Sequence, residues 1–272
     1  MVDPEEPNAA ERRRWNDERW TERWPKREAL TGAVTGVLLD GLGPVAGQRL
    51  LDVGAGGGGT SIAAGRLVGD GAVVGADISA PLVRFARDRA AAARAVNVSF
   101  VVADVQCDTV PGGPFDAALS QFGVMFFDEP SVAFANIRNQ LVPGGRLAFA
   151  CWQPPERNPW FVGPMLAEYL PPPPPPAPGK SPTGPFSLSD PDHTRNVLAA
   201  AGWRDIAHRG HEVVVTVDRS ALADDDTFAS LDLPAAGVEQ ARRDVDARLD
   251  RLRDADGRMR APLAFWVVTA TA

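Results

Sequence analysis

The middle of the chain alternates short apolar runs with longer segments in which apolar residues recur at helical spacing. Each apolar run has the length of a β-strand and is bounded by glycine, proline or polar residues, as strands usually are. Strands that alternate with helices indicate a mainly parallel sheet with helices on both faces. The pattern therefore predicts a doubly wound α/β fold. The expected strands are Leu50–Val53, Ala72–Asp77, Val98–Ala103, Phe115–Ser120 and Arg146–Trp152.

The chain before the first strand is first polar and then helical in character. Met1–Asn8 contains three acidic residues and two prolines and is expected to be disordered. Pro25 is expected to divide the following helical region into two helices. Trp20 and Trp24 are four positions apart and therefore share one helical face. Two interpretations stay open: residues 1–47 form an aromatic lid over a ligand, or the tryptophans simply dock the helix on the core.

The chain after the fifth strand begins with a proline-rich segment, residues 153–190. It contains the run Pro171–Pro176, which favours extended polyproline II and cannot join a sheet. We interpret the segment as a rim over a substrate, because it follows directly from the carboxyl end of a strand. A spacer, or a docking site for a proline-binding partner, is the alternative.

The last part, residues 191–272, is expected to complete the core that residues 48–152 begin. Asp205–Val217 and Leu263–Thr271 have the apolar character of two further strands. Between them, residues 221–260 contain clustered charges with apolar residues at helical spacing, which predicts a helical insert.

Composition narrows the classes of function. The chain has 272 residues, of which 44% are hydrophobic, and this suits one elaborated α/β domain with a sizeable core. Its two cysteines are too few for a disulfide or zinc framework. No apolar run reaches transmembrane length and the N-terminus lacks the apolar stretch of a signal peptide, so we expect a cytoplasmic protein without a membrane partner. The net charge of −7 argues against a nucleic-acid partner.

A glycine-rich turn, Gly54-x-Gly56-x-x-Gly59, follows the first strand. Strand, glycine turn and helix form the first half of a nucleotide-binding βαβ unit, and glycine lets the backbone come close to a ligand. Asp52 stands two residues before the first glycine. A carboxylate there would repel a pyrophosphate, but it would attract a ligand with an ammonium and a sulfonium group, such as S-adenosylmethionine. The alternative is that Asp52 only ties the glycine loop.

Two more acidic residues follow the next two strands. Asp77 ends the second strand, where a carboxylate can accept hydrogen bonds from ribose hydroxyls. Asp104 follows the third strand and could accept from an adenine amino group. Because the carboxyl ends of parallel strands meet at one edge of the sheet, we expect these acids to lie near Asp52 and the glycine turn.

Over roughly Gln48–Trp152 the sequence resembles the class I S-adenosylmethionine-dependent methyltransferases. It is most similar to the small-molecule branch, which includes ubiquinone, menaquinone and natural-product methyltransferases. The resemblance implies a Rossmann-like fold whose last two strands form an antiparallel hairpin, and S-adenosylmethionine as the cofactor. The pieces that match in order and spacing are Leu51–Gly58, Gly75–Ser79, Val101–Val105, Phe115–Ser120 and Leu141–Leu147.

The resemblance also implies a set of cofactor contacts. In the family the glycine turn approaches the cofactor, the acid after the second strand holds the ribose, and residues after the third strand surround the adenine. The residues after the fourth strand lie near the methionine part, whose amino group the acid of the first motif contacts, directly or through water. The residues assigned in this way are Asp52, Gly54, Ala55, Gly56, Asp77, Ile78, Asp104, Val105, Ser120, Gln121 and Phe122.

The implied reaction is an in-line displacement in which a small-molecule acceptor attacks the methyl group, and the protein mainly supplies proximity. A general base is needed only if the acceptor must lose a proton. His193 is the first candidate for that base, since it stands at a predicted helix start after the rim. We expect no metal site, because no histidines or cysteines have ligand spacing. The candidates for the acceptor pocket are Trp20, Trp24, Trp152, Trp160 and Tyr169.

Other functions stay open at this point. The cofactor could serve a cyclase or another tailoring enzyme that transfers no methyl group, and the glycine motif also fits a nicotinamide-dependent oxidoreductase. A methyltransferase acting on a macromolecule is a further alternative. The acceptor, the methylated atom and the choice between monomer and homodimer are not fixed by the sequence.

Overall fold

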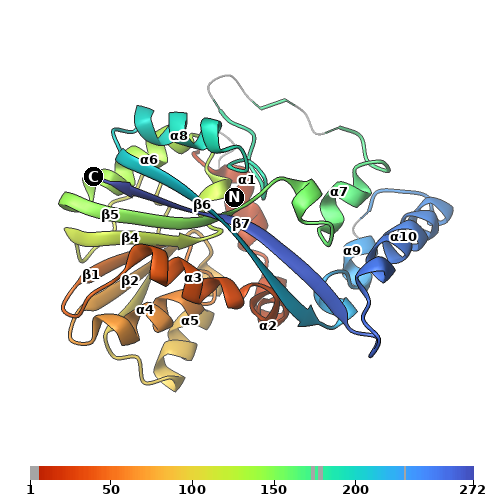
Figure 1. The fold of residues 1–272 in the computed structure, drawn as a ribbon, viewed down its shortest axis with the longest axis horizontal. Helices are drawn as coiled ribbons and strands as arrows, with labels where there is room; N and C mark the ends of the chain where they lie inside the picture. Colours follow the sequence, from red (N-terminus) through yellow and green to blue (C-terminus); the bar gives the residue numbers. More distant parts are fainter. Residues whose placement is uncertain (1–5, 173–174, 177–179, 230) are drawn as a thin grey trace.

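The computed structural model describes residues 6–172, 175–176, 180–229 and 231–272. A single sheet of seven strands in the order β3-β2-β1-β4-β5-β7-β6 runs through the molecule (Figure 1). The strands are β1 (Arg49–Val53), β2 (Ala72–Asp77), β3 (Val98–Val102), β4 (Phe115–Gln121), β5 (Leu141–Trp152), β6 (Arg204–Val217) and β7 (Met259–Thr271).

The first five strands are parallel to one another, and β7 is antiparallel to both of its neighbours, β5 and β6. This confirms the predicted doubly wound, Rossmann-like sheet with a C-terminal antiparallel hairpin. Because the strand order reverses beside β1, the crevice between the carboxyl ends of β1 and β4 is where open α/β sheets usually bind ligands.

Successive residues of β1 show how the sheet is covered on both faces. Leu50 is fully buried in a cluster with side chains of α3 and α4, and Leu51 is fully buried in a cluster with side chains of α6. Neighbouring strand residues point to opposite faces, so a continuous apolar run marks a strand buried on both sides. The covering helices are α3 (Ala33–Leu42), α4 (Gly59–Val68) and α5 (Ala80–Ala92) on one face and α6 (Pro130–Asn139) and α8 (Pro191–Ala200) on the other (Figure 1).

The N-terminal helices are α1 (Ala9–Trp15) and α2 (Arg19–Thr31). The prediction that Pro25 separates two helices was wrong, since Pro25 lies inside α2. The break falls at Asn16, whose side-chain oxygen accepts from the Ala80 N–H at the start of α5. A proline removes one backbone donor, and α2 tolerates that loss, whereas the tertiary contact of Asn16 ends α1.

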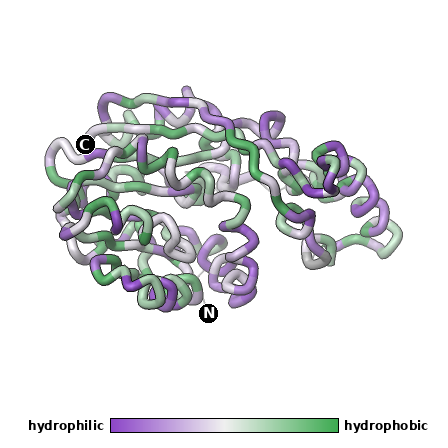
Figure 2. Tube along the Cα trace, turned by 60° about the horizontal axis from the view of Figure 1, so that its bottom comes forward, coloured by the Kyte–Doolittle hydropathy of each residue, from purple (hydrophilic) through white to green (hydrophobic). Residues whose placement is uncertain are grey.

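The two strands of the C-terminal hairpin, β6 and β7, are 14 and 13 residues long, and the far end of the hairpin carries a lobe of helices (Figure 1). The predicted insert is helical, and its longest helix buries Ala241, Val245 and Leu249. Along the Cα trace, hydrophobic residues gather in the central strands and hydrophilic ones on outer helices (Figure 2). The helices of this part are α7 (Val162–Leu166), α9 (Asp225–Ala229) and α10 (Ala235–Leu249). The short 3-10 helices are η1 (Val124–Phe126), η2 (Pro155–Arg157), η3 (Arg219–Ala221) and η4 (Asp250–Leu252).

Part of the predicted rim, residues 173–174 and 177–179, lies outside the described residues, as do residues 1–5. No helix in the described part of the chain is long and apolar enough to cross a membrane.

Candidate functional site

A cavity lies at the carboxyl ends of β1 and β2, beside the segments that follow β3 and β4. It encloses about 1070 Å³ of space, counting its open mouth. Residues of α1 and α2 form the wall opposite the sheet. The predicted site residues on its surface are Trp24, Asp52, Gly54, Ala55, Asp77, Ile78, Asp104, Val105, Gln121 and Phe122.

The glycine turn forms the floor of the cavity and has almost no room for side chains. Gly54 has φ +69°, and a Cβ atom there would lie 2.8 Å from the Cα of Gly123. Gly56 has φ +53°, and its Cβ would lie 2.1 Å from the Trp24 ring. Both residues need the left-handed conformation that glycine adopts without strain. The turn therefore brings bare backbone to the cavity and lets Trp24 pack directly on it.

Among the three acids at the strand ends, Asp52 is the one with an oxygen that no described residue bonds. It is 1% exposed, and its Oδ2 accepts from the Ser61 hydroxyl at 2.6 Å. Its Oδ1 has no hydrogen-bond partner among the described residues. Burial raises the pKa of Asp52 to about 7. A buried acceptor without a partner is costly, so this oxygen suits a ligand that brings a cationic donor.

Asp77 joins the end of β2 to the glycine turn. Its Oδ2 accepts from the Gly56 N–H at 2.7 Å, and its Oδ1 accepts from the Ser79 N–H at 2.8 Å. Burial raises the pKa of Asp77, and the two backbone donors act in the opposite direction. Each carboxylate oxygen can accept more than one hydrogen bond, so Asp77 keeps acceptor capacity for ligand hydroxyls.

Asp104 differs from the expectation, because the N-terminal segment already binds its carboxylate. The Asn8 side-chain amide donates to both oxygens, at 2.8 and 3.0 Å. The Gln106 N–H donates to Oδ1 at 3.0 Å, and Arg12 lies 3.4 Å from Oδ2. Burial raises the pKa of Asp104, while the hydrogen bonds from Gln106 and Asn8 and the charge of Arg12 lower it by a smaller amount. An adenine amino group would therefore compete with Asn8 and Arg12 for this acid.

Asn8 closes this end of the cavity. It is 2% exposed. The sequence predicted disorder from Met1 to Asn8, and for Asn8 that prediction was wrong. Its backbone N–H donates to the Asp128 side chain at 3.0 Å, and its side-chain oxygen accepts from the Asp128 N–H at 2.8 Å. Lys180 also binds Asp128, at 2.6 Å. Asp128 thus links the N-terminal segment to the chain that follows the proline run.

Gln121, at the end of β4, is fixed by three hydrogen bonds. Its side-chain oxygen accepts from the Thr35 hydroxyl at 2.8 Å and the Thr60 hydroxyl at 3.3 Å. Its side-chain amide donates to the Thr31 carbonyl at 3.2 Å. Gln121 therefore joins the end of β4 to the start of α4 and to the helices α2 and α3, beside Asp52.

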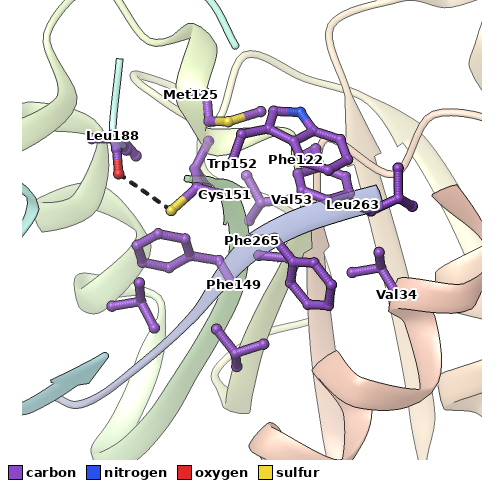
Figure 3. Packing of buried hydrophobic residues seen from close by; sticks show 14 of the residues in the cluster. Val34, Val53, Phe122, Met125, Phe149, Cys151, Trp152, Leu188, Leu263 and Phe265 are labelled. Carbon is purple, nitrogen blue, oxygen red and sulfur yellow. Dashed lines mark hydrogen bonds between the residues drawn. The ribbon is translucent and has the colours of Figure 1, made fainter. Parts of the chain in front are cut away.

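An aromatic wall lies behind the residues that follow β4. Phe122 faces the cavity and stacks on Trp152, with ring centroids 3.8 Å apart and planes at 9° (Figure 3). Trp152 is 1% exposed and does not line the cavity. It supports the wall from behind rather than forming its surface.

Residues 50–145 match the protein family described as "Methyltransferase domain". The sheet order, the glycine turn and the strand-end acids lie within or beside the matched region. By this match and by the relatives below, the chain is similar to the class I S-adenosylmethionine-dependent methyltransferases of the small-molecule branch.

The curated relatives of this chain carry the names of small-molecule methyltransferases. It is 33% identical to aklanonic acid methyltransferase DauC of Streptomyces sp. strain C5, over 49% of this chain and 65% of that one. It is 35% identical to demethylmenaquinone methyltransferase of Thermus thermophilus, over 41% and 50%. It is 37% identical to nocamycin O-methyltransferase of Saccharothrix syringae, over 47% and 46%. The matches thus span between about half and two thirds of these relatives.

Solved structures share the fold at low sequence identity. The YcgJ protein of Bacillus subtilis superposes with a TM-score of 0.60 at 17% identity, over 88% of this chain and 98% of that one. The [4+2]-cyclase SpnF superposes with a TM-score of 0.54 at 19% identity, over 88% and 79%. These likenesses confirm the Rossmann-like fold.

Several predicted site residues of this chain do not line the cavity. The Trp20 ring packs on Trp15, 4.5 Å between centroids. The Trp160 N–H donates to the Pro262 carbonyl at 2.7 Å. Three others also lie outside the lining: Ser120, whose hydroxyl donates to the Val53 carbonyl, Tyr169, whose hydroxyl binds Asp244, and His193, which is exposed on α8. Gly56 also lies outside the lining, under Trp24.

Most of the wall that α2 and the start of α3 provide was not predicted from the sequence. Residues at positions 24, 27, 28, 31 and 35 all face the cavity. Their spacing is that of one helical face, so the inclusion of Trp24 could have drawn attention to the others. Asn8 and Glu11 line the cavity too, and nothing in the local sequence signals the bonds of Asn8 to Asp104 and Asp128. The described residues contain no group of three metal-ligating side chains.

Proposed function

We propose that this chain binds S-adenosylmethionine in the cavity and transfers its methyl group to an oxygen, nitrogen or carbon nucleophile of a small molecule. The acceptor is a secondary metabolite or a quinone-like compound. The names of the relatives support this class, because they include a polyketide-type acid, nocamycin and demethylmenaquinone. Within this proposal the chain needs no nucleic-acid or membrane partner, and it works as a monomer or a homodimer.

The observation that carries the proposal is the unpartnered Oδ1 of Asp52 in a cavity lined by three strand-end carboxylates. Such a cavity favours a ligand with positive charge and hydroxyl groups over one with phosphates. S-adenosylmethionine has an ammonium, a sulfonium and two ribose hydroxyls, and no phosphate. The donors and acceptors of the cavity therefore fit this cofactor better than a nicotinamide dinucleotide.

The residues that would hold the cofactor follow from their positions. Asp52 would accept from the ammonium group, beside Gln121. Asp77 would accept from the ribose hydroxyls with its remaining acceptor capacity. Ile78 and Val105 are the apolar residues that would pack on the two faces of the adenine.

When bound, S-adenosylmethionine supplies a methyl group on a positively charged sulfur. The chain's own contribution is to hold the reactants in line and close together, and to exclude water with the aromatic wall that Phe122 and Phe126 contribute. The described lining contains no histidine, cysteine, tyrosine or lysine. His193 is exposed on another helix, so a role for it as base is a proposal that the cavity's geometry does not support.

The test is an incubation with methyl-labelled S-adenosylmethionine and a panel of aromatic polyketides and quinones. We expect S-adenosylhomocysteine to accumulate and the label to enter one acceptor class, as measured by mass spectrometry. Conversion of a panel compound without a gain of mass would instead identify a cyclase-like enzyme. Binding of NADH in a fluorescence titration, without binding of S-adenosylmethionine, would identify an oxidoreductase.

A further inference from the structure

The wall of the cavity opposite the sheet has a cation between two aromatic rings. Arg27 lies on α2, three positions after Trp24. Its Cζ is 5.6 Å from the Trp15 ring centroid and 5.9 Å from the Trp24 ring centroid. All three residues line the cavity, and the Arg27 side chain is half-buried. The cation is therefore part of the surface that a ligand in the cavity would meet.

The Arg27 guanidinium has no hydrogen bond or ion pair with any residue that the structure describes. Burial lowers the pKa of Arg27 to about 10, and the like charge of Arg14 acts in the same direction. The group therefore keeps its charge at neutral pH. A guanidinium offers five N–H donors, and a charge that is partly removed from water without an acceptor is costly. Arg27 thus suits a ligand that brings a negative charge.

The two glutamates that line the cavity have other partners than Arg27. Glu28 pairs with Arg89 at 2.8 Å. Glu11 accepts from the Trp15 ring N–H at 2.8 Å. The three acids at the strand ends belong to the sheet edge. The cavity thus has negative charge along the sheet edge and a positive charge in the opposite wall.

Flat apolar surface lies beside this cation. The Trp15 ring meets the Phe126 ring at 5.4 Å between centroids and 76° between planes, and Phe126 lines the cavity as well. An aromatic ligand gains from contact with such rings beyond the area that it buries. A planar guanidinium matches a carboxylate with two parallel hydrogen bonds. Rings and cation together therefore suit a planar aromatic acid.

We infer that the methyl acceptor is an aromatic acid whose carboxylate Arg27 binds, with its ring against Trp15 and Phe126. This inference rests on the proposed function and names the chemical class of the acceptor. The acids of the sheet edge attract a positively charged cofactor and repel an acidic acceptor. Charge therefore assigns each ligand to its own wall of the cavity, and such complementarity gives specificity.

The test is calorimetry of the full chain, saturated with S-adenosylhomocysteine, with two probes: 2-naphthoate and the uncharged 2-naphthamide, which has the same rings. We expect 2-naphthoate to bind about 10-fold more tightly than 2-naphthamide, the usual gain for a hydrogen bond to a charged group. Arg27→Gln should lose this preference and keep its affinity for 2-naphthamide and S-adenosylhomocysteine. Arg27→Lys keeps the charge but not the paired donors, so it should keep part of the preference. Arg13→Gln, at an exposed site on α1, is the matched control and should bind both probes like wild type.

Four results would overturn the inference. The first is equal affinity of wild type for the two probes, or no binding of 2-naphthoate at millimolar concentration. The second is a preference for 2-naphthoate that survives in Arg27→Gln. The third is an equal loss for both probes in that variant, which would mean that Arg27 only holds the tryptophans in place. The fourth is weaker binding of S-adenosylhomocysteine by Arg27→Gln, because Arg27 would then serve the cofactor.

The outcomes separate this inference from the proposed function. Absence of S-adenosylhomocysteine binding to the unmodified protein would contradict the proposed function, while the comparison of the two probes without that ligand would still decide the role of Arg27. Unfolding temperatures of the variants show whether they fold. If Arg27→Gln does not fold, Arg27→Lys decides, and a preference for 2-naphthoate equal to that of wild type would overturn the inference.

Discussion

The carboxyl group of Asp52 sets the charge of the cavity at neutral pH. Its pKa of about 7 means that the buried group is protonated in mildly acidic solution and ionised above it. Desolvation disfavours the charged form, and the single hydrogen bond from Ser61 offsets only part of that cost. A ligand ammonium beside Oδ1 would favour the ionised form. Cofactor binding and ionisation of Asp52 are therefore linked.

The affinity for S-adenosylhomocysteine should depend on pH through this group. Below about pH 7 binding must expel the proton of Asp52, so affinity should rise as the pH is raised toward 7 and then level off. Calorimetry between pH 5.5 and 8 in buffers of different ionisation enthalpy measures the affinity and the proton release, within the range where the ligand's own groups do not titrate. Asp52→Asn should bind more weakly and lose this dependence. A wild-type affinity that is flat over the same range would contradict the link.

The same group should lower the stability of the unliganded protein at high pH. The folded pKa of about 7 lies above the unfolded value of about 4. Between these values the folded state holds the proton more strongly, so the free energy of unfolding falls as pH rises and stays low above 7. Asp52→Asn, which can still accept from Ser61, should therefore unfold at a higher temperature than wild type at pH 8. The difference in unfolding temperature between Asp52→Asn and wild type should shrink at pH 5. A difference that does not depend on pH would refute the raised pKa of Asp52.

At the scale of elements, the N-terminal segment is the part whose position depends on a few polar contacts. Asn8 has φ +50° and connects Asp104 with Asp128. α1 itself is only seven residues long, too short to be stable alone. Its docking comes from these hydrogen bonds, from the bonds of Trp15 and Asn16 to the start of α5, and from the packing of the Trp15 ring.

Asn8→Gly should loosen α1 without straining the backbone, since glycine keeps the left-handed conformation. We expect amide hydrogens in α1 to exchange roughly tenfold faster, as for the loss of a hydrogen bond to a charged group, and those of α4 to exchange as before. Hydrogen-exchange mass spectrometry of the full chain measures both. Exchange in α1 that equals wild type would show that Asn8 does not hold the segment.

The strands could be predicted from the sequence because they are buried on both faces, and such runs as Leu50–Val53 are apolar throughout. The grouping of the acids could be predicted as well, because each follows a parallel strand and the carboxyl ends of parallel strands meet at one edge of the sheet. The end of α1 could not be predicted, because the contact between Asn16 and Ala80 joins residues far apart in the chain. Asn8 was missed likewise, because its partners Asp104 and Asp128 lie far along the chain.

At the scale of the whole molecule, the fold leaves one crevice where bare backbone, buried carboxylates and aromatic rings meet. β6 and β7 complete the sheet on the far side of β5, so they take no part in the carboxyl edge at β1. The methyltransferase match covers residues 50–145, whereas α1 and α2 lie outside it and supply the opposite wall.

A calorimetric titration of the full chain with S-adenosylhomocysteine at pH 7.5 tests the central claim most directly, at a pH where Asp52 is mostly ionised. The account predicts saturable binding of one ligand per chain, with a dissociation constant within about 1 μM to 1 mM, the range common for enzyme ligands. Heats that stay at the dilution baseline to millimolar ligand would contradict it.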